Sequence, residues 1–299
     1  MANENLNPIL IIDGENILHQ SFHKFENFRS EDGKKSGAIY GFFRHLHFLV
    51  VRFHPQEVYI TFDNGHSPIR ESLLKDYKGH RKNIAIDYDS LQKQKRVILK
   101  ILGILRIKYV YDKKKITQWE GDDFLAYLAN ALDFKGKILI VSSDKDFNQL
   151  LNNRIKIYNP RKEDIITKPT CKIKFGYESK ETVDFLSLVG DKSDDIPGYP
   201  GIGEKKARQF LDKYGSIENA LKEDSDFPDK DKLREIYERN RVLIDLKYFI
   251  KEHPIKELPL KQYKDAKIKE NRLKKICIDY SLHSFMTTRF INPFIELLK

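Results

Sequence analysis

The chain has 299 residues, of which 40% are hydrophobic and 12% aromatic, so it can form a packed core and is not a disordered protein. Its 54 Lys and Arg residues outnumber its 44 Asp and Glu residues, which gives a formal charge of +10 and a pI near 9.2. This excess favours a polyanionic partner such as nucleic acid, and a lysine-rich proteome would also produce it. No apolar stretch approaches the roughly 20 residues of a membrane-spanning helix. Cys171 and Cys277 are expected to be reduced thiols in a cytoplasmic setting.

Three apolar runs in the first half of the chain predict buried strands, and each run ends in aspartate. The runs and their aspartates are residues 8–12 with Asp13, residues 57–62 with Asp63, and residues 137–143 with Asp144 and Asp146. Helices are predicted at 36–53 and 90–102, and a further strand at 106–111. Strands that alternate with helices indicate an α/β fold with a largely parallel sheet. Because the carboxyl ends of parallel strands meet at one edge, the aspartates should converge in a crevice there.

The segment from about residue 67 to residue 89 is poor in apolar residues and rich in Lys and Arg. It includes Arg70, Lys78 and Arg81, and Tyr77 places an aromatic ring beside Lys78. So few apolar residues predict a segment that is held only weakly on the core. A solvated basic loop would explain this pattern, but basic residues around an aromatic platform also suit single-stranded nucleic acid.

Five further acidic residues come from two later stretches, just before a helical run at 124–132 and within residues 190–207. They are Glu120, Asp122, Asp123, Asp191 and Asp194. With the strand-end aspartates they provide nine carboxylates and no accompanying histidine or cysteine. An all-oxygen donor set predicts Mg²⁺ or Mn²⁺, and so many carboxylates suit two ions ~3.5–4 Å apart that clamp a phosphodiester. A structural calcium cluster is the alternative.

The second part of residues 190–207 is rich in glycine. Gly201 and Gly203 predict a tight turn whose backbone amides can approach a partner, and a helix is predicted to open from that turn at Glu204. Lys205 and Lys206 lie in the first turn of this helix. The order of the two parts predicts a metal site directly beside a phosphate-binding site.

Six stretches together resemble the flap endonuclease family of 5′-nucleases, which includes bacteriophage enzymes and the N-terminal domain of bacterial DNA polymerase I. The stretches are IIDGENIL (11–18), FDNGHSPIR (62–70), DYKGHR (76–81), WEGDDFLAYLA (119–129), VSSDKDFNQLL (141–151) and GDKSDDIPGYPGIGEKKA (190–207). They span most of residues 9–215. The last stretch is the most specific, because it joins paired aspartates to a helix-hairpin-helix.

The resemblance implies a PIN-like 5′-nuclease fold with a helical arch at about 67–89 and a helix-hairpin-helix at about 183–215. It implies one metal ion held by Asp13, Asp63, Asp122 and Asp144 with assistance from Glu120 and Asp123, and a second held by Asp146, Asp191 and Asp194. It also implies that Lys78 and Arg81 meet the scissile phosphate as catalytic residues, and that K⁺ binds at the hairpin. The residues expected to contact DNA are Arg70, Tyr77, Lys78, Arg81, Gly201, Gly203, Lys205 and Lys206.

The chain departs from the family's usual residues at two positions. Gln20 stands where relatives usually have arginine, which removes one cation from substrate contact. Asp195 stands where relatives usually have asparagine, which would weaken or redistribute binding at the second metal. All nine expected carboxylates remain, so neither change predicts an inactive protein.

We therefore expect residues 1–180 to form an α/β nuclease domain and residues 181–299 a helical region, with no chemistry assigned after about residue 255. The expected function is a Mg²⁺-dependent, structure-specific 5′-nuclease that acts as flap endonuclease and 5′-3′ exonuclease on branched or 5′-flap DNA. A PIN-type ribonuclease and a non-catalytic DNA-junction binding protein are the alternatives. RNA primer–DNA hybrids are expected as further substrates and replication proteins as partners. A monomer in the cytoplasm, or in the host cytoplasm if a phage encodes it, is expected, without membrane contact.

Overall fold

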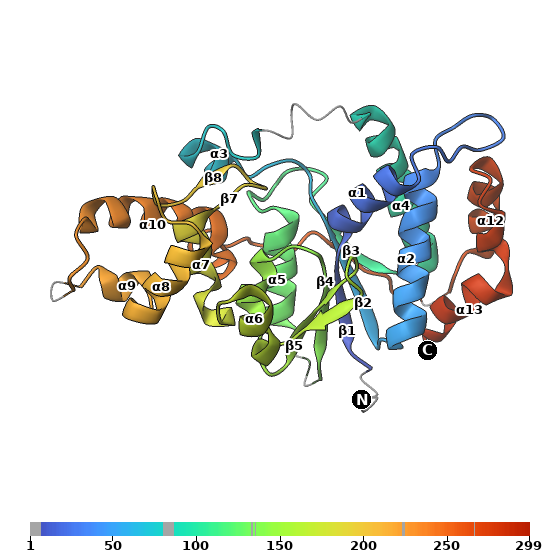
Figure 1. Ribbon diagram of the computed structural model, residues 1–299. Coiled ribbons are helices and arrows are strands. Elements are labelled where there is room, and N and C mark those ends of the chain that lie inside the picture. The colour runs from blue at the N-terminus through green and yellow to red at the C-terminus, as the bar shows by residue number, and fades with distance from the viewer. Residues whose placement is uncertain (1–6, 80–86, 133, 135, 223–224, 266) are drawn as a thin grey trace.

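A seven-stranded sheet runs through the middle of the molecule (Figure 1). The structure is a computed structural model that describes residues 7–79, 87–132, 134, 136–222, 225–265 and 267–299. The strand order is β6-β5-β4-β1-β2-β3-β9. The strands are β1 (Ile9–Asp13), β2 (Glu57–Phe62), β3 (Lys108–Tyr111), β4 (Ile138–Val141), β5 (Ile155–Asn159), β6 (Asp164–Ile166) and β9 (Leu260–Lys261). The first five run parallel to one another, and β6 and β9 close the two edges antiparallel. The predicted α/β class with a largely parallel sheet is confirmed.

Both faces of the sheet are buried, because alternate residues of each strand point to opposite sides. In β1, Leu10 and Ile12 belong to one core and Ile9 and Ile11 to the other. Three helices pack on the first face, namely α1 (Gly14–Lys24), α2 (Gly37–Phe53) and α4 (Tyr88–Leu105). The second face is covered by α5 (Gly121–Ala131) and α6 (Lys168–Phe175). None of the described helices is both long and apolar enough to span a membrane.

The elements predicted from apolar spacing are present, with shifts of a few residues at their ends. One shift is at β3, which was predicted from residue 106 but begins at Lys108. The reason is that α4 continues to Leu105, and Arg106 then ends it with a left-handed φ of 62°. The chain leaves the helix at this C-cap residue and can enter β3 only after it.

A helical region follows the sheet and lies to one side of it, at the left of Figure 1. It contains α7 (Thr182–Val189), the short pair β7 (Gly190–Asp191) and β8 (Ile196–Pro197), α8 (Glu204–Tyr214), α9 (Ile217–Ala220), α10 (Lys230–Ile244) and α11 (Leu246–Glu252). The two helices predicted for the hairpin motif are α7 and α8. Ser216 caps α9 by accepting a hydrogen bond from the Asn219 N–H. Single turns lie at η2 (Asp146–Leu150), η3 (Ser179–Glu181) and η4 (His283–Met286).

The C-terminal residues do not stay with this helical region, in contrast to the expectation of one region over 181–299. β9 pairs with β3, and α12 (Glu270–Asp279) and α13 (Thr288–Glu296) pack against α4 and α2 on the first face of the sheet. Phe290 and Phe294 are buried there in the same core as α2. The tail is basic overall, so its composition did not indicate this apolar stripe. The stripe packs on the first face of the sheet and its helices in the nuclease half.

Candidate metal and nucleic-acid site

The parallel strands deliver aspartates to one edge of the sheet. Asp13 ends β1 and also caps α1, because its carboxylate accepts a hydrogen bond from the Asn16 N–H at 2.9 Å. The same carboxylate accepts a second hydrogen bond from the Ser142 hydroxyl at 2.8 Å. Asp63 directly follows β2 and accepts the N–H of Gly121, which opens α5. β1 pairs in parallel with β2 and with β4, so the residues at the carboxyl ends of these strands lie near one another although they are far apart in the sequence.

A cleft of about 710 Å³ opens at this edge of the sheet. Five carboxylates predicted as metal ligands and one predicted catalytic cation line it, namely Asp13, Asp63, Asp122, Asp144, Asp194 and Lys78. They come from β1, the turn after β2, the first turn of α5, the turn after β4, the β7–β8 hairpin and the turn after α3 (Pro68–Leu73). Residues separated by up to 181 positions thus share one cavity.

Burial and mutual repulsion favour the protonated form of four of these carboxylates, which are Asp13, Asp63, Asp122 and Asp144. Burial, with added repulsion from Asp63 and Asp144, raises the pKa of Asp13 from 3.8 to about 7. Burial and the charges of Asp13 and Asp63 raise the pKa of Asp122 well above its ordinary value. The pKa of Asp63 and that of Asp144 are also raised, first by burial and then by neighbouring carboxylates. A bound cation would relieve this repulsion, so the donor set fits a hard divalent ion.

A second group of carboxylates lies where the β7–β8 hairpin meets η2. Burial and repulsion from Asp144, Asp191 and Asp194 raise the pKa of Asp146 well above its ordinary value. The Asp146 Oδ1 atom is buried and has no hydrogen-bond partner. Lys145 Nζ lies 3.6 Å from Asp191 Oδ1. An orphaned carboxylate oxygen among like charges is the arrangement that a second cation would satisfy.

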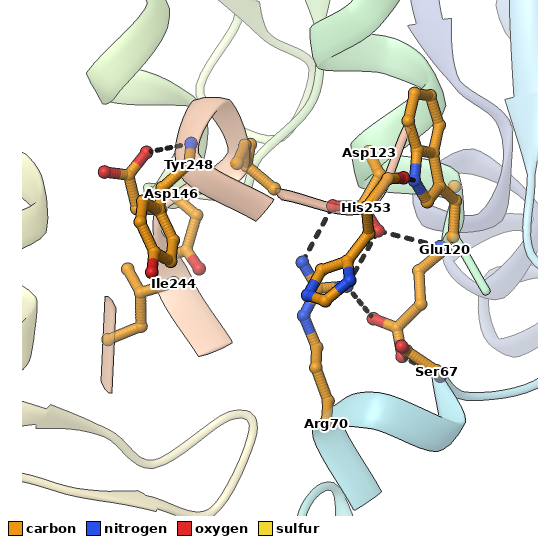
Figure 2. Close-up of polar contacts among 12 residues, drawn as sticks. Ser67, Arg70, Glu120, Asp123, Asp146, Ile244, Tyr248 and His253 are labelled. Carbon is orange, nitrogen blue, oxygen red and sulfur yellow. Dashed lines mark hydrogen bonds and ion pairs between the residues drawn. The ribbon is translucent and has the colours of Figure 1, made fainter. Parts of the chain in front are cut away.

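Glu120 and Asp123 differ from the other carboxylates because cationic side chains donate hydrogen bonds of 2.7 Å to both of them. Arg70, on α3, donates two hydrogen bonds of 2.7 Å to Asp123, and its Nη1 atom lies 3.4 Å from Glu120 Oε2 (Figure 2). The Asp123 carboxylate also accepts the Glu120 N–H, which closes the capping box of α5. Although burial favours its neutral form, Lys78 and Arg70 lower the pKa of Glu120 to about 2. These two acids act here as counterions.

The basic segment before α4 is more tightly held than predicted. Arg70, Tyr77 and Lys78 are 1%, 4% and 3% exposed, and Lys78 Nζ lies 2.7 Å from Glu120 Oε2 and 3.6 Å from Asp194 Oδ2. The Tyr77 hydroxyl also donates to Glu120, at 3.0 Å. The expectation of a weakly held segment is wrong for residues 67–79, because buried ion pairs replace the missing apolar contacts.

The burial of these side chains changes what they can contact. Tyr77 presents no open ring face for a base, and Arg70 is enclosed between Asp123 and the ring of Phe249, 3.9 Å away. Lys78, by contrast, lines the cleft. The other predicted catalytic residue, Arg81, lies outside the described residues, as does the central part of the predicted arch.

The predicted phosphate turn lies outside the cleft lining. Gly201 has a left-handed φ of 78°, and Gly203 is the N-terminal cap residue of α8. A Cβ atom at either position would meet no atom of the described residues within 4 Å. Lys205 and Lys206 are exposed beside them, and Lys206 Nζ donates to the Gly201 carbonyl at 2.9 Å. An open backbone at a helix N-terminus suits the approach of an anion.

Several ionisable residues that line the cleft were not predicted, among them Glu15 and Lys95. These two form an ion pair in which Lys95 is buried and Glu15 partly buried, with Lys95 Nζ 2.7 Å from Glu15 Oε2. The signal was present in the sequence, because Lys95 falls on the apolar stripe of its helix with Leu91 and Ile98. A lysine at such a position needs a buried acid, but the sequence does not say which one.

The two departures from the family pattern have local explanations. Gln20 donates to the Asn16 side chain, which in turn hydrogen-bonds with Ser143, so its amide belongs to a polar network beside Asp13. Asp195 has a left-handed φ of 56°, a conformation that Asp and Asn tolerate better than most residues. Exchange of Asn for Asp therefore preserves the backbone there.

Among the residues that the structure describes, no group of three or more His, Cys, Asp or Glu side chains is already arranged to hold one metal ion. Donor type, burial and the unpaired Asp146 oxygen nevertheless match what such an ion needs. A shared ion would thus require rotation of these side chains.

The fold is shared with solved structures of a bacteriophage protein and an archaeal flap endonuclease. The chain matches the bacteriophage T5 D15 protein co-crystallised with metal ions with a TM-score of 0.63 and 15% identity, over 98% of this chain and 100% of that one. It matches flap endonuclease-1 from Methanococcus jannaschii with a TM-score of 0.62 and 15% identity, over 99% and 94% of the two chains. These likenesses establish the arrangement of sheet, cleft and helical region.

Sequence comparison establishes the family. Residues 8–176 match the model of the 5′-3′ exonuclease N-terminal resolvase-like domain, and residues 177–281 match that of the 5′-3′ exonuclease C-terminal SAM fold. A 5′-3′ exonuclease of Aquifex aeolicus is 34% identical over 273 residues, which cover 91% of this chain and 90% of that protein. DNA polymerase I of Thermus aquaticus is 30% identical over 72% of this chain and 25% of its own length. The chain belongs to the 5′-3′ exonuclease family and is a nuclease.

Proposed function

We propose that this nuclease hydrolyses phosphodiesters of branched DNA near single-strand/duplex junctions, as a 5′-flap endonuclease and 5′-3′ exonuclease that depends on Mg²⁺. The observation that carries the proposal is the cleft that Asp13, Asp63, Asp122 and Asp144 line together, with raised pKa values. Among proteins of the same fold, one T5 D15 structure contains DNA and metal ions, and the catalytic core of Rad2 is in complex with a DNA substrate. These neighbours support DNA and divalent ions as ligands here.

The proposed metal ligands form two groups. Asp13, Asp63, Asp122 and Asp144 would hold one ion, and Asp146, Asp191 and Asp194 a second. Two Mg²⁺ ions, or Mn²⁺ in their place, would supply an activated water and would stabilise the negative charge on the attacking and leaving oxygens. Glu120 and Asp123 would act indirectly, because their oxygens already accept from Lys78, Arg70 and backbone groups.

The chain's own cations would then orient the substrate. Lys78 lines the cleft and lies between Glu120 and Asp194, so its ammonium can donate to a scissile phosphate without leaving the acidic site. Gly201 and Gly203 leave backbone amides open to a duplex phosphate, with Lys205 and Lys206 beside them. K⁺ at this turn would compete with Lys206 for the Gly201 carbonyl. We also propose RNA primer–DNA hybrids as substrates and replication proteins as partners. The protein is proposed to be a monomer in the cytoplasm.

The test uses one variant of the cleft and one matched control. Wild type, Asp144→Ala and Asp279→Ala, which removes an exposed carboxylate on α12, are incubated with a labelled 5′ flap, a blunt duplex and an RNA hairpin. Each reaction is run with Mg²⁺ and with chelator. Wild type and Asp279→Ala should cut the flap only with Mg²⁺, and Asp144→Ala should not cut it.

Each other outcome has a defined meaning. Cleavage by Asp144→Ala at the wild-type rate would remove the metal assignment. Preference for the RNA hairpin would favour a PIN-type ribonuclease. Binding of the flap by wild-type protein without any cleavage would favour the junction-binding alternative.

A further inference from the structure

Lys95 is a buried lysine in the wall of the cleft. It is 3% exposed, and its ammonium donates to Glu15 Oε2 at 2.7 Å and to the main-chain carbonyl of Asp63 at 2.6 Å. The rings of Phe62 and Tyr111 flank it, with their centroids 5.5 Å and 5.2 Å from Nζ. Both hydrogen bonds of the ammonium are thus directed at Asp63 and at α1, the helix that Asp13 caps.

Stability alone does not account for this ion pair. Burying a lysine and a glutamate costs several kcal/mol of desolvation for each charge, and well-packed apolar residues of similar volume often serve stability equally well. The position of Lys95 on the apolar stripe of α4, with Leu91 and Ile98, would accept such a residue. The pair therefore has a use other than filling the core.

The geometry identifies that use. Asp63 is fixed at two points, because its carbonyl accepts from Lys95 of α4 while its carboxylate accepts from Gly121 of α5. Glu15 lies in the first turn of α1, two residues after Asp13. The Lys95 ammonium therefore links α1, the helix that begins directly after Asp13, to Asp63.

We propose that Lys95 is a positioning residue that sets Asp63 relative to Asp13 for divalent-metal binding, with Glu15 as its counterion. This role rests on the proposed metal-dependent function and adds a residue that reaches the metal site only through Asp63. Glu15 neutralises the lysine, so the pair fixes the backbone without adding net charge to the carboxylates of the cleft.

The test separates positioning from stability by removing the pair in two ways. Lys95→Met leaves the partly buried Glu15 without its 2.7 Å ion pair, with His19 Nε2 3.6 Å away, and is expected to destabilise the protein. The double variant Glu15→Gln/Lys95→Met removes both charges and should fold even if the single variant does not. Lys100→Met makes the same chemical change at an exposed position of the same helix and is the control.

Three quantities are measured for each protein: melting without metal, the Mg²⁺ concentration that half-saturates the melting shift, and single-turnover cleavage of a 5′ flap. The double variant should melt close to wild type without metal. Its half-saturating Mg²⁺ concentration should rise by about fivefold or more and its maximal rate fall by about tenfold, with the DNA concentration for half-maximal rate changed by less than about twofold. Lys100→Met should match wild type in all three.

The proposal is overturned if the double variant regains wild-type Mg²⁺ saturation and rate, because the pair would then be structural. It is also overturned if Lys100→Met shows the same losses. A wild-type protein whose melting and cleavage ignore Mg²⁺ would overturn the proposed function itself, and the metal-positioning role with it.

Discussion

Buried carboxylates of the cleft fall into two electrostatic classes. Glu120 is paired with Lys78 and Arg70, which keep its pKa at about 2. Asp13 and Asp122 face mainly other carboxylates, and burial with this repulsion raises their pKa values. Glu120 is therefore charged at any working pH, whereas Asp13 becomes fully charged only above neutrality.

The second class makes the stability of the metal-free protein depend on pH. In the unfolded chain Asp13 has its ordinary pKa of 3.8, and in the folded protein its pKa is about 7. Between these values the folded state binds more protons than the unfolded state, so stability falls as pH rises through that window. With chelator, the melting temperature should therefore be lower at pH 8 than at pH 5. Saturating Mg²⁺ should raise it more at pH 8, because the ion binds the deprotonated carboxylates.

Melting curves at the two pH values, with chelator and with Mg²⁺, check this expectation. Asp144→Asn serves as the comparison, since one repelling charge fewer should flatten the pH dependence of the metal-free protein. A Mg²⁺ shift of equal size at both pH values would contradict the assignment of these carboxylates as ligands.

At the scale of elements, the strand ends could be predicted and the ion pairs could not. An apolar run that ends in aspartate specifies both a strand and the edge at which its last side chain emerges, so the convergence of Asp13, Asp63 and Asp144 followed from period and topology. Arg70 and Asp123 are 53 positions apart, and Lys95 and Glu15 are 80 apart. No local periodicity encodes such partners, which is why the segment at 67–79 was expected to be loose.

The hairpin offers a prediction at the same scale. Gly203 has an extended backbone, with φ of −96° and ψ of −177°, and a side chain at this position would meet no described atom within 4 Å. Nothing inside the described protein therefore requires glycine there. Threonine is accepted at helix N-caps at a cost of no more than a few tenths of a kcal/mol, so Gly203→Thr should melt near wild type.

Its effect should appear only when DNA is bound. The added side chain would hold a phosphate away from the amides at the start of α8, so affinity for a duplex should fall by about tenfold, the loss of roughly one charge-assisted hydrogen bond. Affinity for a short single strand should change less. Fluorescence anisotropy with both ligands measures this, and equal losses for the two would refute a duplex-specific role of the turn.

At the scale of the whole molecule, the C-terminal helices stabilise the nuclease half. Phe294 of α13 is 0% exposed and lies in the core that α2 and α4 form on the first face of the sheet. Phe294→Ala should lower the free energy of unfolding by about 3–5 kcal/mol, since a large cavity would remain. Urea unfolding measures this loss, and flap cleavage below the melting temperature should persist because the residue lies away from the cleft lining.

Ile278 provides the matched control, because it is 62% exposed on α12. Ile278→Ala should change the free energy of unfolding by less than about 0.5 kcal/mol. A loss for Phe294→Ala as small as that of the control would mean that α13 contributes little to this core.

The packing of α13 on α2, and of β9 on β3, also determines when the first core can be completed during synthesis. β9, at residues 260–261, completes the sheet edge at β3, and α13 covers α2, which ends at Phe53. At about 5–20 residues per second, the roughly 240 residues between α2 and α13 take on the order of 12–50 s to leave the ribosome. For that time the apolar surface destined for Phe290 and Phe294 has no partner from its own chain. The nascent nuclease half is thus expected to bind holding chaperones until α13 has been synthesised.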